Sequence, residues 1–235
     1  MGADEQLIPL VTSVNVACGA HAGDPVTMQR TVRLAKASGV ALGAHPGYPD
    51  RDGFGRRDLA MSAEELEASL LAQLGALWAF IREADVNLVH VKPHGALYNR
   101  AARDPALAAT VARGVRRFSA DVILVGLAGS ALLDAGRAAG LAVAAEAFAD
   151  RAYEDDGSLR SRALEGSLHE EPRVAAAQAL SIARDGIVRS HGGRAVDVRA
   201  DTICLHGDTP GAPRIAQAVR ETLAAAGIPL RPLTA

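Results

Sequence analysis

The chain alternates short apolar runs with longer segments whose apolar residues recur at helical spacing. The runs, typical of buried strands, lie at 12–18, 40–44, 88–91, 122–125, 141–145 and 202–205. Between two of them, Leu107, Val111, Val115 and Phe118 form one apolar stripe of a helix. The order of strand, polar loop and helix repeats about six times, which predicts a parallel sheet with helical crossovers and an α/β fold.

Helix boundaries are marked by local signals. Asp24-Pro25 and Asp104-Pro105 each place a capping residue before a proline at the first helical position. Ser62 and Glu65 have the spacing of a capping box and open a long helix. Gly39 can end the first of these helices in a left-handed conformation.

The later part of the chain is less regular. Residues 152–171 form a polar loop, and Ile187 to Arg199, with Gly192-Gly193 at the centre, predicts a small hairpin. No linker or shift in composition divides the chain, so we expect one domain over residues 1–235.

Composition narrows the class of protein. Hydrophobic residues make up 49% of the chain and aromatic residues only 3%, which is typical of a sheet core built from Ala, Val, Leu and Ile. A net charge of −2 without long charge runs gives no support to nucleic-acid binding. No signal peptide or transmembrane run is found, and Cys18 and Cys204 are read as buried free thiols. We therefore expect a cytoplasmic protein without membrane contact.

Polar side chains of catalytic type follow the predicted strands. They are His21, His45, Lys92, His94, Glu146, His206 and Asp208. The carboxyl ends of parallel strands are where the active sites of barrels and open α/β sheets form. Four of the seven histidines fall in such places, which predicts one shared site.

Strand alternation refines this set. His90 and Lys92 share one face of their strand, and the valines between them suit the face toward the helices, so both polar residues should point inward. Lys92 is one of only two lysines in an arginine-rich chain. Asn15 has the parity to place an amide inside the sheet, whereas Asp24, near His21, can act simply as a helix cap. A buried structural role for His90 is as well supported as a functional one.

Several mechanisms lack their sequence signatures. The chain has no phosphate-binding loop of the P-loop type, no dinucleotide fingerprint and no Gly-x-Ser-x-Gly elbow. The histidines and nearby carboxylates leave a divalent metal open, but no His-x-x-x-His spacing requires one.

The motifs together resemble those of the LamB/YcsF family, whose members are described as the A subunit of 5-oxoprolinase. The matching segments span nearly the whole chain and lie at 10–19, 21–25, 43–46, 53–57, 90–99, 126–130, 148–151 and 200–210. The resemblance implies an irregular seven-stranded β/α barrel, similar to that of polysaccharide deacetylases. It also implies ATP-dependent opening of the lactam ring of 5-oxo-L-proline to L-glutamate, in a complex with subunits B and C.

The family pattern normally begins with a strand of the type Asp-Leu-Asn-Cys-Asp-Leu-Gly-Glu. This chain begins after that point, at Met1-Gly2-Ala3-Asp4, so we expect the first strand of the barrel to be missing and the edge beside Asn15 to be open. A longer form carrying that strand is expected to be more stable and more active.

The residues suggest roles within this reaction. A histidine among His21, His45 and His94 is the candidate general base, and Lys92 the group that stabilises negative charge. Glu146 and Asp208 are candidates to orient imidazoles, and Arg151 to bind the substrate carboxylate. Because no nucleotide loop is found, ATP is expected to be handled with the partner subunits.

Two alternatives remain open at this stage. A stand-alone metal-dependent amidohydrolase or deacetylase would bind a divalent ion and need no ATP. A non-catalytic lactam-binding subunit would bind 5-oxoproline even without His94. Assembly of several copies of the chain is compatible with either.

Overall fold

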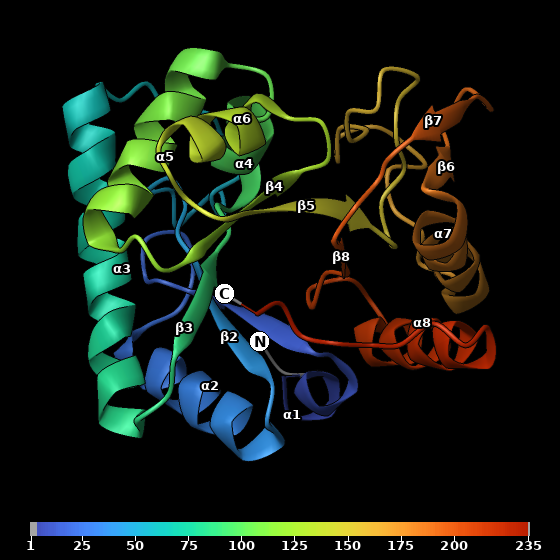
Figure 1. The fold of residues 1–235 in the computed structure, drawn as a ribbon, viewed down its shortest axis with the longest axis horizontal. Coiled ribbons are helices and arrows are strands. Elements are labelled where there is room, and N and C mark those ends of the chain that lie inside the picture. The colour runs from blue at the N-terminus through green and yellow to red at the C-terminus, as the bar shows by residue number, and fades with distance from the viewer. Residues whose placement is uncertain (1–3, 235) are drawn as a thin grey trace. The chain divides into compact units, whose positions relative to one another are not determined.

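The computed structural model describes residues 4–234, and its sheet confirms the predicted α/β class. The strands are β1 (Ser13–Ala17), β2 (Ala41–His45), β3 (Leu88–Val91), β4 (Ile123–Leu127), β5 (Val143–Phe148), β6 (Ile187–Arg189), β7 (Ala195–Asp197) and β8 (Thr202–Cys204). Six of them form one sheet in the order β1-β2-β3-β4-β5-β8 (Figure 1). The pairs β1–β2, β2–β3, β3–β4 and β5–β8 are parallel. The seven-stranded, deacetylase-like barrel stays a prediction.

The helices begin and end where the local signals predict. They are α1 (Asp4–Leu7), η1 (Ile8–Leu10), α2 (Pro25–Ser38), α3 (Ala63–Ala84), α4 (Gly95–Ala101), α5 (Pro105–Phe118), α6 (Ala131–Ala138), α7 (Pro172–Asp185) and α8 (Ala212–Ala225). Asp24 and Asp104 accept hydrogen bonds from the first turns of α2 and α5, and Ser62 and Glu65 form the complete capping box of α3. Gly39 ends α2 at φ +66°.

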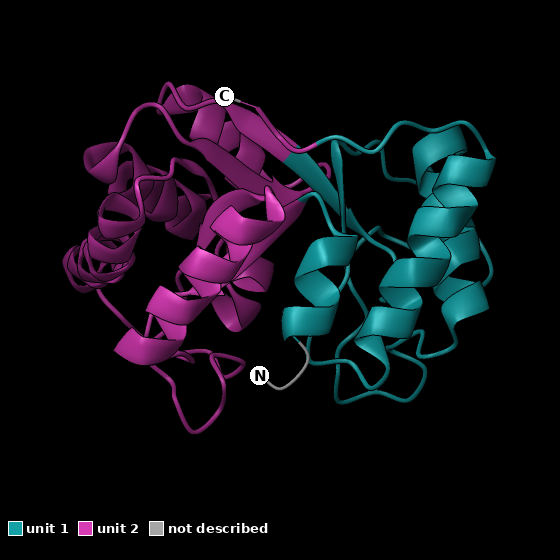
Figure 2. Ribbon diagram, turned by 90° about the horizontal axis from the view of Figure 1, so that it is seen from below, with its two compact units in different colours: residues 1–12, 145–231 teal, residues 13–144, 232–235 magenta. Residues whose placement is uncertain are grey.

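The chain divides into two compact units (Figure 2). Unit 2, residues 13–144 and 232–235, holds β1 to β4 and the helices α2 to α6. Its core includes the fully buried face of α3, which repeats at Leu66, Leu70, Leu74, Leu77 and Ile81. The stripe predicted on α5 packs against the same core. This packing fixes the strands from whose ends polar side chains project.

Unit 1, residues 1–12 and 145–231, is built around a helix pair. Alanines of α7 (Ala175, Ala176 and Ala179) pack with Ile215 and Val219 of α8 in one buried cluster. The small side chains let the two helices approach closely. The predicted hairpin is confirmed as the antiparallel pair β6–β7.

None of the helices within residues 4–234 combines the length and the apolar character needed to span a bilayer.

Candidate functional site

Three histidines meet at the carboxyl ends of neighbouring strands in unit 2. His21 follows β1, His45 ends β2, and His94 follows β3. The rings of His21 and His94 stack at 3.9 Å with an interplanar angle of 4°, and the His45 ring stands edge-on to His94 at 4.8 Å. The parallel pairing of β1, β2 and β3 brings these side chains together, as the sequence predicts. We call these three residues the histidine cluster.

A chain of polar contacts passes through two of its rings. His45 Nδ1 lies 2.7 Å from the carbonyl oxygen of Lys92, and His94 Nε2 lies 2.8 Å from that of Phe54. Carbonyl oxygens only accept, so each ring donates at that end. A neutral imidazole has one N–H, so His45 Nε2 and His94 Nδ1, which are 3.0 Å apart, face each other as acceptors. Both nitrogens of both rings are therefore used within the chain.

Burial keeps the cluster neutral. Loss of solvent lowers the pKa of His21 to about 4 and that of His94 to about 3, with added contributions from nearby cationic groups such as Arg56. The pKa of His45 also falls well below its usual value, through burial first and then through His94 and Lys92. The cluster thus lines this end of the sheet with uncharged polar rings at neutral pH.

Glycines allow the backbone to approach the rings. A Cβ at Gly55, where φ is +68°, would lie 2.8 Å from atoms of both His21 and His94. A Cβ at Gly47 would lie 2.9 Å from His21 Nδ1. The amide of Gln73, buried on α3, holds Gly47 by accepting from its N–H and donating to its carbonyl. Gln73 is a positioning residue that sequence reasoning missed.

Inside the sheet, His90 and Asn15 form a pair. His90 Nε2 donates to Asn15 Oδ1 at 2.9 Å, and His90 Nδ1 is buried without a partner. The inward parity predicted for both residues is consistent with this contact. Lys92, two residues on, is only 5% exposed, and its ammonium lies 5.6 Å from the ring centre of Tyr98. Burial lowers the pKa of His90 to about 4.

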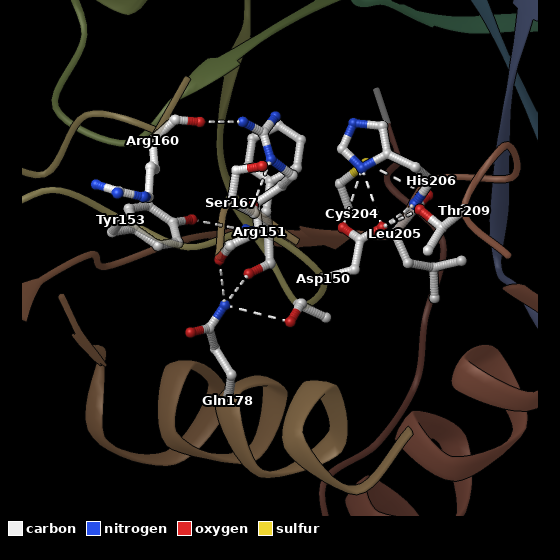
Figure 3. A network of polar contacts seen from close by, with 12 residues as sticks. Asp150, Arg151, Tyr153, Arg160, Ser167, Gln178, Cys204, Leu205, His206 and Thr209 are labelled. Atoms are coloured by element: carbon white, nitrogen blue, oxygen red, sulfur yellow. Dashed lines mark hydrogen bonds and ion pairs between the residues drawn. The ribbon is translucent and has the colours of Figure 1, made fainter. Parts of the chain in front are cut away.

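A second polar group, in unit 1, joins a carboxylate to a histidine (Figure 3). Asp150 is fully buried and accepts from the backbone N–H of His206 at 2.8 Å and from its ring Nδ1 at 3.0 Å. The Thr209 hydroxyl also donates to it. Burial raises the pKa of Asp150, but the hydrogen bonds and charge of His206 outweigh this and bring it to about 2. His206 was predicted, whereas Asp150 was not.

The remaining candidates have different settings. Glu146 is buried on β5 and Asp208 is exposed, and their predicted orienting roles stay predictions. Asp24 caps α2, the role that the sequence offered as its alternative. Arg151 is buried and donates to the carbonyl oxygens of Ser167 and Arg160, so it ties down the loop that follows β5.

The arginines of the 50–57 loop contribute structure. Arg57 pairs with the carboxylate of Asp50, a buried residue predicted only as a turn former. Arg56 lies over the ring of Phe54, with 4.9 Å between its guanidinium carbon and the ring centre.

A metal centre finds no ligand set in this part of the molecule. Across residues 4–234, no three His, Cys, Asp or Glu side chains are arranged to hold a metal ion. The nitrogens of His45 and His94 are committed to the chain itself, which explains why three clustered histidines do not form such a site.

Comparison with known proteins gives a consistent result. The model of the LamB/YcsF family matches residues 1–235. A protein of Chloroflexus aggregans, named as the A subunit of 5-oxoprolinase, is 58% identical over 231 residues, covering 98% of this chain and 92% of the relative. A protein of the same name from Methylococcus capsulatus is 55% identical, with coverage of 99% and 90%. The crystal structure of a lactam utilization protein from Thermus thermophilus aligns with a TM-score of 0.93 at 48% identity, over 99% of this chain and 93% of that one.

Proposed function

This chain belongs to the LamB/YcsF family, and we propose that it is the A subunit of a cytoplasmic 5-oxoprolinase. In this proposal the chain acts with subunits B and C to open the lactam ring of 5-oxo-L-proline, with ATP hydrolysis driving the reaction and L-glutamate as product. The observation that carries the proposal is the name shared by relatives that are 58% and 55% identical over nearly the full chain.

The chemistry at the strand ends supports a hydrolytic role. A five-membered lactam is an unreactive amide, and phosphorylation of its oxygen would make its carbon a better electrophile. Because the sequence has no recognised nucleotide loop, we assign phosphorylation to the partner subunits. This chain would then hold the lactam and direct water to its carbon.

Lys92 is the proposed electrostatic group. Its ammonium is buried at the carboxyl end of β3, where low solvent access strengthens its attraction for a developing oxyanion or a phosphoryl oxygen. The neutral rings of the histidine cluster add no competing positive charge at neutral pH. Since both nitrogens of His45 and His94 are engaged within the chain, we assign these rings to shaping the site rather than to proton transfer.

The test replaces Lys92 by methionine, which keeps the length of the apolar stem and removes the charge. In the complex reconstituted with subunits B and C, Lys92→Met should lower kcat for ATP-coupled glutamate release by about 100-fold or more. The matched control is Lys36→Met, because Lys36 is the other lysine and lies exposed on α2. Equal kcat for Lys92→Met and the wild type would remove Lys92 from the site.

A further inference from the structure

Asp150 and His206 occupy equivalent places on neighbouring strands. β5 and β8 are parallel with Phe148 opposite Cys204, and each of the two residues lies two positions beyond that last pair. The carboxylate of Asp150 bonds both the backbone N–H and the ring of His206, so it fixes the position of the residue and the orientation of its imidazole. The contact follows directly from the strand pairing.

The carboxylate also decides the tautomer of the ring. An ionised carboxylate accepts hydrogen bonds and donates none, so His206 Nδ1 must carry a proton. Nε2 is then the nitrogen of the neutral ring that has a lone pair. Figure 3 shows this second nitrogen on the side of the ring away from Asp150.

The segment that carries Asp150 is held firmly. Gln178, from α7, donates from its amide to the carbonyl oxygens of Phe148, Ala149 and Arg151. The ring of Phe148 stacks on that of His206 at 5.4 Å. The Asp150 carboxyl is therefore a fixed reference against which the imidazole is aligned, in the manner of an orienting residue behind a base.

The other candidate histidines lack this arrangement. His45 and His94 use both ring nitrogens within the chain. His21 is 2% exposed, whereas the side chain of His206 is 22% exposed. The other titratable side chains near the Asp150–His206 pair are His169, whose backbone N–H donates to the Asp150 carbonyl, and Cys204 at the end of β8.

From this geometry we propose that His206 is the general base of lactam hydrolysis and that Asp150 is its positioning residue. The inference rests on the proposed function and adds a proton path to it. As the oxygen of water bonds to the lactam carbon, one proton of that water moves to His206 Nε2. When the C–N bond breaks, the imidazolium gives this proton to the ring nitrogen. The second proton of the water stays on the new carboxyl group, which ionises in solvent.

The kinetic test compares two Asp→Asn variants in the reconstituted complex. Asp150→Asn should lower kcat by about 100- to 10,000-fold with a smaller change in KM. The acid limb of its pH–rate profile should move to lower pH, because the imidazolium loses its carboxylate partner. Asp201→Asn, a matched change at an exposed residue that accepts from Ala145 N–H, should retain the wild-type kcat and pH profile. An Asp150→Asn enzyme with the wild-type kcat and acid limb would overturn the proposal.

A second measurement separates this inference from the proposed function. Nitrogen-15 NMR of the full-length wild-type chain at neutral pH should show the His206 ring, assigned by its loss in His206→Gln, with its proton on Nδ1. A proton on Nε2 alone would overturn the inference without any assay of activity. If instead the NMR result holds but the wild-type complex releases no glutamate from 5-oxoproline, the proposed function fails and the general-base role fails with it.

Discussion

At the scale of single residues, the histidines near the strand ends differ in what their ring nitrogens can do. His45 and His94 donate to backbone carbonyls and face each other, whereas His206 is oriented by a buried carboxylate. The sequence predicts where each of these residues lies, because strand ends can be read from apolar runs. It does not predict which nitrogens are engaged, because those contacts depend on loops that fold back from elsewhere.

Two residues that the sequence did not single out illustrate this limit. Asp150 reaches His206 only because β5 pairs with β8, across more than fifty residues of chain. Gln73 lies on the buried face of α3, where an apolar residue would fit the pattern, and its partner Gly47 is in a loop before that helix. Pairing over such sequence separations is set by tertiary packing and leaves no local signal.

Replacing Gln73 by leucine tests the support of the histidine cluster. The variant keeps the volume but leaves the N–H and the carbonyl of Gly47 without their partner. We expect a loss of about 1–3 kcal/mol in the free energy of unfolding for each buried group left unpaired. Urea unfolding of Gln73→Leu beside Gln217→Leu, at an exposed position of α8, measures this. Equal losses in the two variants would contradict the role of Gln73.

At the scale of elements, the sequence predicts most of the architecture. Caps at Asp24, Ser62 and Asp104 and the left-handed Gly39 appear as expected, because these signals act within one turn of helix. The irregular register between β2 and β3 at Leu42 and Gly43 was not predicted. It arises where a large side chain of one strand uses space that its neighbour leaves open.

That space is tested by Gly43→Ala. A Cβ at Gly43 would lie 2.0 Å from His90 Nε2, so the His90 ring would have to move and its bond to Asn15 would be lost. We expect a destabilisation of about 1–3 kcal/mol, measured as the change in the free energy of unfolding. The control is Gly75→Ala on α3, where no atom lies within 4 Å of the added Cβ. That variant should gain about 0.5–1 kcal/mol. Stability gained by Gly43→Ala would refute this account of the β2–β3 contact.

At the scale of the whole molecule, the boundary between the two units falls inside β5. No linker, glycine run or change of composition marks such a boundary, which is why the sequence predicts one domain. The family resemblance, by contrast, could be found from the sequence, since its motifs are local and cover the chain from end to end.

The buried histidines make stability depend on pH. The folded pKa values of His21 and His90 are about 4 and that of His94 about 3, below the ordinary value of 6.5. Between these values the unfolded chain binds more protons than the folded one, so stability is full above pH 6.5 and falls as the pH drops toward 4. The carboxyl of Asp150, with its pKa lowered from 3.8 to about 2, adds stability that is lost over that lower range.

Urea unfolding at about pH 7.5, 5.5 and 4.5 measures this dependence. The midpoint should fall steadily across the series, and His90→Gln should weaken the fall because one buried histidine no longer titrates. His191→Gln, at an exposed position, should leave the slope unchanged. A midpoint that stays constant across the whole series would contradict the assignment of neutral, buried imidazoles.

The central claim is that this chain is the A subunit of a 5-oxoprolinase. The most direct test measures glutamate released from 5-oxo-L-proline in the presence of ATP and purified subunits B and C, with this chain present or omitted. The account predicts ATP-dependent glutamate release only when the chain is present. Equal release without the chain, or none in the complete mixture, would contradict it.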